Sequence, residues 1–473
     1  MNHSNNYLAE EKIGKLMLKF SIPCIMSLLV ASLYNIVDQI FIGQRIGYLG
    51  NGATNVVFPV TVIALAFALL VGDGCAAFLS ICQGRRDPES AHKSVGNAIT
   101  VILVISILFL LALAFFRDTF LTAFGATENN RAYATEYYNF IIPGIPFYMF
   151  ANGMSSIIRA DGNPRFAMLS TLAGAVINVI LDPIAIFVLG WGMMGAALAT
   201  IAGQIVSALL AVWYLTHSSS FKLLNTSFRP AGSILKRFLP LGTSSFLTQL
   251  SIIVIMAVMN NTLVSYGAQS KYGADIPLTV VGIVMKIFQI VIAFVVGIAA
   301  GSQPIIGFNY GAKKYHRVKE IYLKMILAEG VIGVVSTMLF ECFPMQIIGI
   351  FGSESALYNE YAVLSFRIFL STILLCCIQK STSIFLQALG RPFLSMGLSL
   401  LRDFVISVPL VLILPRYLGI TGPLYSAPAA DILSFIAVLL IMPRVLNFKE
   451  GTKEETSDKS WKPNHSIAKS IEA

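Results

Sequence analysis

Two aspartates lie inside long apolar stretches of the sequence, Asp38 in SLYNIVDQIFIG and Asp182 in AGAVINVILDPIAIF. An ionised carboxylate in a lipid-spanning helix costs several kcal/mol and is rarely kept without a function. If the two helices face one another, the carboxyl groups form a binding site for a proton or a metal cation. The residues around them determine whether such a site drives transport, catalyses a reaction or joins helices.

Further oxygen-bearing side chains accompany the aspartates. Asn178 and Asp182 are four residues apart, so they share one face of a helix. Pro183 has no backbone N–H, which frees the carbonyl of Val179 as a further ligand. The remaining candidates on neighbouring segments are Tyr34, Tyr138, Asn152 and Thr200. Hard cations prefer such oxygens, so the residues predict a site for H⁺, or for Na⁺ at Asp38, Asn178 and Asp182.

A structural role is the alternative for the uncharged members of this set. A single polar side chain in a membrane helix often joins helices by hydrogen bonds, and that interpretation stays open for Tyr138 and Asn152. The aspartates differ because no cationic partner lies near them in the sequence. For Asp38 and Asp182 we therefore favour a functional role.

The composition places these residues in a membrane. Of the 473 residues, 56% are hydrophobic and only 12% are charged, with a mean hydropathy of +0.76, whereas soluble domains carry about 25% charged residues. The net charge of +9 does not indicate nucleic acid binding, because Lys and Arg concentrate in short loops between apolar runs. The six cysteines contain no CxxC pair, so we expect no disulfide framework, no zinc site and no bound cofactor.

Twelve apolar segments are long enough to cross the hydrocarbon layer, which takes about 20 helical residues. The sequence thus predicts an all-α integral membrane protein with twelve transmembrane helices. The expected spans are 16–42, 53–82, 95–116, 134–158, 166–190, 192–214, 238–265, 277–307, 319–341, 358–387, 393–415 and 420–442.

Positive charge distributes unequally between the two sets of loops. Eighteen Lys and Arg residues fall in the loops on the side of the amino terminus, against five in the opposite loops. Because Lys and Arg concentrate on the cytoplasmic side, we expect both termini in the cytoplasm and the protein in the plasma (inner) membrane.

The two halves of the chain repeat one another. The pairs that recur at a shift of 227 or 228 residues are Gly84 with Gly311, Gly192 with Gly419, Gly195 with Gly422, and Gly162 with Gly390. Six spans in each half give parallel repeats, with a substrate site between them. We therefore expect two pseudo-symmetric six-helix bundles, 1–214 and 237–445, a cytoplasmic linker, 215–236, and a disordered tail, 446–473.

The second half supplies residues suited to an adaptable binding cavity. The candidates for that cavity, together with Tyr34, are Gln249, Met256, Met259, Asn260 and Phe288. Met and Phe line adaptable surfaces, although such residues in a membrane helix are also common in plain packing. The intramembrane charges to which the sequence assigns no role are Asp73, Lys286, Arg367, Arg402 and Asp403.

No GxxxxGK[ST] loop occurs in the sequence, and no polar segment is long enough for a nucleotide-binding domain. ATP hydrolysis by this chain is therefore excluded. The energy for any transport must come from an ion gradient or from the gradient of the substrate.

The segments FSIPCIMSLLVASLYNIVDQIFIG and NVILDPIAIFVLGWGMMGAALAT resemble those of the multidrug and toxic compound extrusion (MATE) transporters. The resemblance covers about residues 12–445. It implies export of cationic or amphipathic drugs in exchange for H⁺ or Na⁺. We expect a monomer in the lipid bilayer. In relatives the amino-terminal bundle holds the cation site, and Asp38, Asn178, Asp182 and Thr200 occupy the matching positions.

The resemblance also implies a bend at Pro23 that couples cation binding to the substrate cavity. One branch of the family carries a glutamate in the seventh span, but residues 238–265 contain no acid. The sequence is thus similar to the branch whose coupling site lies wholly in the amino-terminal half.

Two other functions compete with drug export. A flippase for lipid-linked oligosaccharide needs a cationic cavity for pyrophosphate, which Lys286, Arg367 and Arg402 would have to supply. An intramembrane aspartyl protease also uses two membrane aspartates, but its YD and GxGD patterns do not fit Val37-Asp38 or Leu70 before Gly72-Asp73.

Overall fold

The computed structural model describes residues 7–218, 223, 225–349 and 355–448, and all regular structure in these residues is helical. The helices of the first half are α1 (Tyr7–Glu10), α2 (Ile13–Ile46), α3 (Tyr48–Arg85), α4 (Pro88–Phe115), α5 (Arg117–Ala123), α6 (Arg131–Ile141), α7 (Ile145–Ala160), α8 (Pro164–Pro183) and α9 (Gly192–His217). A 3-10 turn, Ile142–Gly144, joins α6 to α7, and a π-helical turn, Ile184–Val188, extends α8.

The second half continues the same pattern of long helices. Its helices are α10 (Gly232–Gly267), α11 (Asp275–Gly311), α12 (Tyr315–Cys342), α13 (Pro344–Gly349), α14 (Ala356–Phe369), α15 (Ile373–Ala388), α16 (Pro392–Leu400), α17 (Ser407–Ile413), α18 (Pro415–Leu418) and α19 (Gly422–Leu446). The 3-10 turn Asn225–Phe228 precedes α10, the π-helical segment Leu401–Ile406 joins α16 to α17, and the 3-10 turn Gly419–Thr421 precedes α19.

Ten helical segments of the described residues are long and apolar enough to cross a membrane, and α14 with α15 makes an eleventh that is bent by 47°. One of the ten, Pro392–Leu446, has 55 residues, about 80 Å at 1.5 Å per residue. That length is enough for two crossings of ~30 Å, and the turn at Gly419–Thr421 divides it. The prediction of an all-helical, multi-span membrane protein is confirmed.

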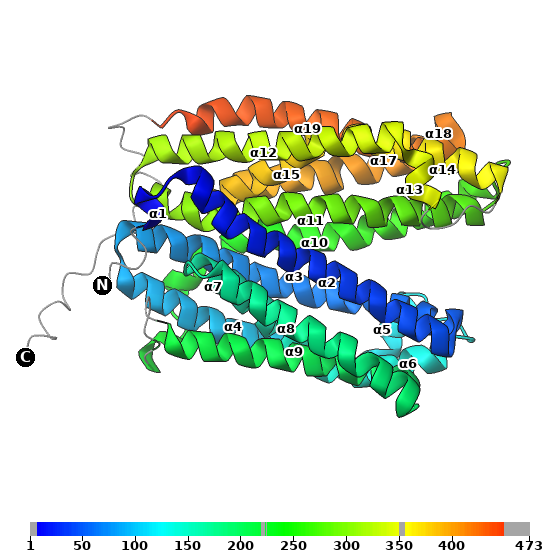
Figure 1. Cartoon of the computed structure of the whole chain (residues 1–473), viewed down its shortest axis with the longest axis horizontal. Coiled ribbons are helices and arrows are strands. Elements are labelled where there is room, and N and C mark those ends of the chain that lie inside the picture. The colour runs from blue at the N-terminus through cyan, green and yellow to red at the C-terminus, as the bar shows by residue number, and fades with distance from the viewer. Residues whose placement is uncertain (1–6, 219–222, 224, 350–354, 449–473) are drawn as a thin grey trace, which may run out of the picture.

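The helices form two groups that lie side by side in Figure 1. The first group contains α2 to α9 and the second α10 to α19. α1 and the last turn of α19 lie at the same end of the molecule, which we call the terminal end. The groups contact one another where α3 packs against α10 and α11 and where α2 packs against α11. Toward the opposite end the ribbons of the two groups diverge (Figure 1).

The backbone repeats between the two groups. Residues with left-handed φ angles occur at corresponding helix boundaries, at the same shift of 227 or 228 positions as the glycine repeat. These pairs are Arg86 (φ 59°) with Lys313 (φ 59°), Gly162 (φ 97°) with Gly390 (φ 75°), and Gly192 (φ 55°) with Gly419 (φ 59°). The recurrence includes a non-glycine pair, so it reflects repeated loop geometry and not glycine content alone.

Glycines bring the two groups into backbone contact near the terminal end. A Cβ added to Gly242 of α10 would lie 2.8 Å from the Cα of Leu70 in α3. A Cβ added to Gly301 of α11 would lie 2.7 Å from the Cα of Ser21 in α2. Small residues allow this close approach of membrane helices, where packing rather than water exclusion drives association.

The bend between α14 and α15 departs from the continuous span expected at 358–387. It contains hydroxyl side chains and no proline. Ser371 donates to the carbonyl of Ile368 (2.8 Å), and Thr372 donates to Asp431 of α19 (2.8 Å). Such local side-chain bonds compete with the helical pattern. Of the predicted tail, 449–473 lies outside the described residues, as do 219–222 and 224 of the predicted linker.

Candidate functional site

The packing of α2 along α8 brings Asp38 and Asp182 together inside the first group. Asp38 is 8% exposed and Asp182 is fully buried. The two carboxyl groups lie close enough to share a hydrogen bond. Two adjacent buried carboxylates repel one another and lack water to stabilise their charge. The pair is therefore stable only with a proton or a cation between its oxygens.

Asn178 connects this pair to α9. Its Nδ2 donates to Oδ1 of Asp182 (3.2 Å) and to Oγ1 of Thr200 (3.3 Å). Both amide hydrogens are thereby used, and the side chain is held in one orientation. Among the described residues, Asp38 Oδ1, Asn178 Oδ1 and Asp182 Oδ2 are buried without a hydrogen-bond donor. Buried acceptors are normally satisfied, so these three oxygens suit a bound cation.

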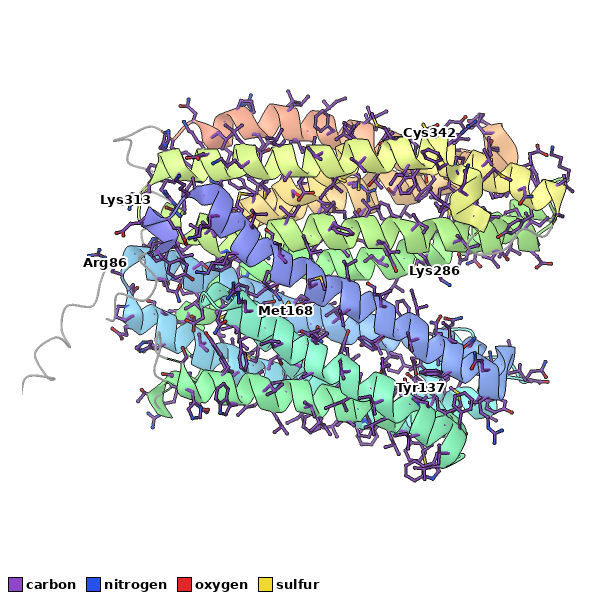
Figure 2. The ribbon with its side chains drawn as sticks, in the orientation of Figure 1. Arg86, Tyr137, Met168, Lys286, Lys313 and Cys342 are labelled. Atoms are coloured by element: carbon purple, nitrogen blue, oxygen red, sulfur yellow. The ribbon has the colours of Figure 1, made fainter. Side chains whose placement is uncertain are left out.

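Tyrosines surround the carboxyl pair, but Tyr138 is not one of them. The hydroxyl of Tyr138 donates to the carbonyl of Leu113 in α4 (2.8 Å), away from the aspartates. Its neighbour Tyr137 instead lies beside Thr200 and close to both aspartates. Figure 2 shows Tyr137 among the helices of the first group, in the half of the molecule away from the terminal end. One residue turns a helix by about 100°, so these tyrosines face different neighbours.

Tyr34 and Asn152 lie at different distances from the pair. Tyr34, one turn before Asp38 on α2, is close to both aspartates and to Tyr148 of α7. Asn152 is half-buried one turn after Tyr148 and donates to its backbone carbonyl (2.9 Å). Asn152 is thus not among the direct partners of the aspartates. We call Asp38, Asn178, Asp182, Thr200, Tyr34 and Tyr137 the carboxyl cluster.

Three of the residues expected in a substrate cavity share one face of α10. This face packs on α3 at Gly242 and Ser245. Residues three or four positions apart lie on the same face of a helix, so Gln249, Met256 and Asn260 lie on this face too. Gln249 and Met256 are half-buried and Asn260 is exposed. The face therefore points toward the first group in the region where the ribbons diverge.

The other two cavity candidates belong to the packed interior of the second group. Met259 is buried in its hydrophobic core. Phe288 of α11 packs edge-on against Phe369 of α14, with ring centres 6.4 Å apart. Lys286 of α11 is exposed and lies on the side of the second group that faces the first (Figure 2).

Pro23 lies in the part of α2 that contacts the second group. Ser21 and Ile25, on either side of it, approach Gly301 and Gly297 of α11. Pro23 is buried and cannot donate to the preceding turn. One helix therefore carries Asp38 of the first group and also, around Pro23, the contact with the second group.

Most remaining intramembrane charges are paired. Asp73 of α3 accepts from Ser156 of α7 (2.7 Å) and from Ser245 of α10 (2.8 Å), which joins the two groups. In the second group the buried network comprises Lys380–Asp403 (2.5 Å), Arg402–Asp403 (2.6 Å), and Arg402–Asp431 (2.8 Å). Arg367 is exposed, 3.8 Å from Glu341. Lys286, Arg367 and Arg402 thus form no common cationic site.

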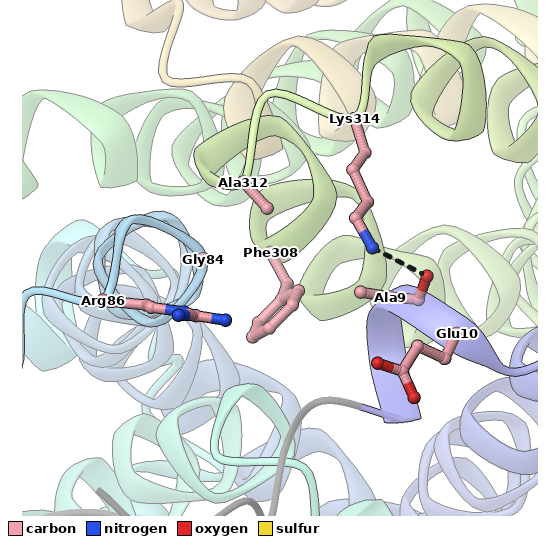
Figure 3. Close-up of a pocket in the computed structure, with 7 residues that line it drawn as sticks. All are labelled: Ala9, Glu10, Gly84, Arg86, Phe308, Ala312 and Lys314. Atoms are coloured by element: carbon pink, nitrogen blue, oxygen red, sulfur yellow. Dashed lines mark hydrogen bonds between the residues drawn. The ribbon is translucent and has the colours of Figure 1, made fainter.

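A cavity of about 90 Å³ lies at the terminal end, between α1, the end of α3 and the end of α11. Figure 3 shows its lining residues, with Lys314 donating to the carbonyl of Ala9 (3.3 Å). It contains none of the candidate site residues. Sequence reasoning overlooked Tyr137, Tyr148 and Glu329; Glu329 carried the same signal as Asp38, an acid within an apolar span.

A family model, MatE, matches residues 23–184 and 245–413, more than half of the chain. The chain belongs to the MatE family. It is a multi-pass membrane transporter rather than an enzyme. The two matched segments contain Asp38 and Asp182 in the first group and most of α10 to α17 in the second.

Known relatives extend this likeness over almost the whole chain. The multidrug export protein MepA of Staphylococcus aureus strain N315 is 25% identical over 92% of this chain and 95% of its own. A multidrug resistance MATE family transporter of the MOP superfamily, solved in an outward-facing conformation, has a TM-score of 0.84 and 25% identity over 94% of this chain and 98% of its own. A MATE protein solved in complex with MaD3S has a TM-score of 0.86 and is 24% identical, covering 94% of this chain and 99% of its own chain. This last comparison shows a similar fold.

Proposed function

We propose that this protein is a cation-coupled antiporter that exports organic cations and amphipathic drugs in exchange for H⁺ or Na⁺. The observation that carries the proposal is the carboxyl cluster, in which three buried oxygens have no donor among the described residues. The export activity named for MepA, a relative over 92% of the chain, supports the choice of substrate class.

The cluster suits reversible cation binding more than a permanent metal site. It offers two carboxylates, one amide oxygen and the Thr200 hydroxyl, which bind H⁺ or Na⁺ as transported ions. The described residues contain no group of three His, Cys, Asp or Glu side chains that would hold a metal tightly. A coupling ion must be released in every cycle, so moderate affinity favours transport.

Coupling between ion and drug runs through α2 in this proposal. The helix carries Asp38 and also packs on α11 around Pro23. Binding of a cation between Asp38 and Asp182 draws α2 toward α8, and the contact of α2 with the second group changes with it. The drug binds along the α10 face of Gln249, Met256 and Asn260, which faces the same region.

The placement in the membrane is also part of the proposal. The excess of Lys and Arg in the loops at the terminal end supports cytoplasmic termini in the plasma membrane. We further propose bundles at 1–214 and 237–445, a linker at 215–236 and a monomeric transporter. The coupling site then belongs to the first bundle, since α10 contains no acid.

The oligosaccharide flippase receives less support. Arg402 is buried between Asp403 and Asp431, and Arg367 lies beside Glu341. Lys286 is the single member of the expected cationic set that is exposed toward the first group. A lone lysine is a poor match for pyrophosphate, which is bound by several converging cations.

The test is efflux of a cationic dye from liposomes that contain the full-length protein, under a pH gradient and a Na⁺ gradient imposed separately. One charge moved by ~100 mV is worth ~2.3 kcal/mol, or roughly fiftyfold accumulation. Asp38→Asn and Asp182→Asn should each abolish gradient-driven efflux. Asp118→Asn, at an exposed aspartate of α5, is the matched control and should transport normally. Normal efflux by both cluster variants would refute the proposal.

A further inference from the structure

The second group contains a carboxyl group that neither the carboxyl cluster nor the buried ion network uses. Glu329 lies in the middle of α12 and is fully buried. Neither of its oxygens has a hydrogen-bond partner among the described residues. The hydroxyl of Ser381 on α15 lies beside it, outside hydrogen-bond geometry, and has no other partner among those residues.

In the part of the chain that the structure describes, no cation is available to neutralise Glu329. Lys380, next to Ser381 in the sequence, is bonded to Asp403, and Arg402 is shared between Asp403 and Asp431. That network contains two cations and two carboxylates, so its charge is balanced. An unpaired carboxylate buried in a membrane protein costs several kcal/mol. Glu329 is therefore neutral in this conformation and carries a proton.

The helices packed on α12 are α15, α11, α14, α13 and α2. The titratable group they place near Glu329 is the Cys377 thiol of α15. Of their other charged groups, Asp38 of α2 belongs to the carboxyl cluster. The rest are bonded elsewhere or exposed: Lys380, Arg367, Glu360, Asp275, Lys286, Lys15, Lys19 and Arg45.

The surroundings of Glu329 select a proton over a metal ion. Its polar neighbours are the Ser381 hydroxyl and the Cys377 thiol, whereas Na⁺ and other hard cations need several oxygens. The outer face of α12 and α15 carries an apolar hollow of about 640 Å³ beside it, lined in part by Gly330 and Ile378. Lipid chains fill such a surface, so water does not reach the carboxyl group from that side.

We propose that Glu329 is a second proton-binding group of this transporter, which releases and rebinds its proton as α12 and α15 shift during the cycle. When the O–H bond breaks, the proton passes to water, and the carboxylate left behind accepts a hydrogen bond from Ser381. This inference rests on the proposed function, since a second proton matters only where transport is coupled to cations.

The test compares Glu329→Gln with the wild type as purified full-length protein. The amide has the shape of the protonated acid but cannot release a proton. Two quantities are measured: protons released to a pH indicator on binding of a cationic dye, and the infrared C=O band of a protonated carboxyl group across a pH series. We expect the variant to lose one such band and to release one proton fewer per dye bound. Asp118→Asn should change neither quantity.

An unchanged proton count in Glu329→Gln, or a Glu329 band that does not respond to dye or pH, would overturn the inference. If this variant fails to fold, Ser381→Ala tests the same point, because loss of the hydroxyl should displace the pH at which the band disappears; no displacement overturns the proposal. If dye efflux by the wild type depended on neither the pH gradient nor the Na⁺ gradient, the proposed function would instead be refuted. Coupled wild-type efflux with an unaltered Glu329→Gln would refute only this inference.

Discussion

Asp38 of α2 and Asp182 of α8 face one another from helices that are held in different ways. Asn178 fixes Asp182 from one turn away on the same helix (3.2 Å), whereas Asp38 lies on a helix that also contacts the second group through Ser21 and Ile25. Displacement of α2 relative to α8 therefore changes the distance between the carboxyl groups. Because charge interaction in a buried site depends strongly on distance, the affinity for a cation changes with it.

Tyr137 and Tyr138 form a matched pair for testing the limits of the carboxyl cluster. Tyr137→Phe removes the hydroxyl that lies beside Thr200 and the aspartates. We expect weaker cation dependence of dye efflux with little loss of stability. Tyr138→Phe removes the bond to Leu113 and should cost about 1 kcal/mol of stability without altering the cation dependence. The cation dependence is measured as dye efflux against cation concentration, and the stability by thermal unfolding. If the two variants altered the cation dependence equally, the assignment of Tyr137 but not Tyr138 to the carboxyl cluster would be contradicted.

Asp73 and Ser245 join the two groups near the terminal end (2.8 Å). Ser245→Ala removes this bond, whereas Ser244→Ala removes a bond to Ser399 inside the second group. A hydrogen bond to a charged group is worth about 1.5–3 kcal/mol, so Ser245→Ala should shift the equilibrium toward separated groups roughly tenfold or more. Spin labels at the exposed positions 86 and 313, in a cysteine-free background, report the distance between the ends of α3 and α11. The distribution should lengthen for Ser245→Ala and stay unchanged for Ser244→Ala.

Much of the fold was predictable because lipid imposes simple rules. Spans of about 20 apolar residues and the glycine repeat were enough to expect two related groups of helices. Asp38 and the Asn178–Asp182 pair were predictable as candidates, since an acidic residue in an apolar span is costly and is rarely kept without a function. The choice between Tyr137 and Tyr138 was not predictable, because both tyrosines lie in α6 and only the packing of that helix shows which of the two faces the aspartates.

The cavity candidates on α10 show a second limit of prediction from sequence, because they do not all lie on the same side of the helix. Gln249, Met256 and Asn260 share a face, but Met259 is rotated into the core. Composition alone identifies Met as adaptable without showing which side of the helix it occupies. The bend at Leu370–Thr372 was also unpredictable, since Thr372 bonds there to Asp431, 59 residues away in the sequence.

The ion network of the second group should be essential for stability. Asp403→Asn leaves Lys380 and Arg402 with a single buried carboxylate, Asp431. Breaking one partner of a buried ion pair costs about 3–5 kcal/mol, so the thermal midpoint in detergent should fall clearly. Adding Lys380→Met to Asp403→Asn restores a one-to-one pair of Arg402 with Asp431 and should recover most of the loss. A double variant no more stable than Asp403→Asn would show that charge balance is not the reason.

The closeness of α3 and α10 depends on the missing side chain of Gly242. Gly242→Ala places a methyl group 2.8 Å from the Cα of Leu70, a distance that forces backbone to move and not only side chains. We expect the helices to separate, with lower thermal stability and reduced dye efflux. Gly282→Ala on α11 is the matched control, because a Cβ there meets nothing within 4 Å; it should be neutral or stabilise by about 0.5–1 kcal/mol through better helix propensity. Equal stability of the two variants would show that the contact of α3 with α10 tolerates a wider spacing.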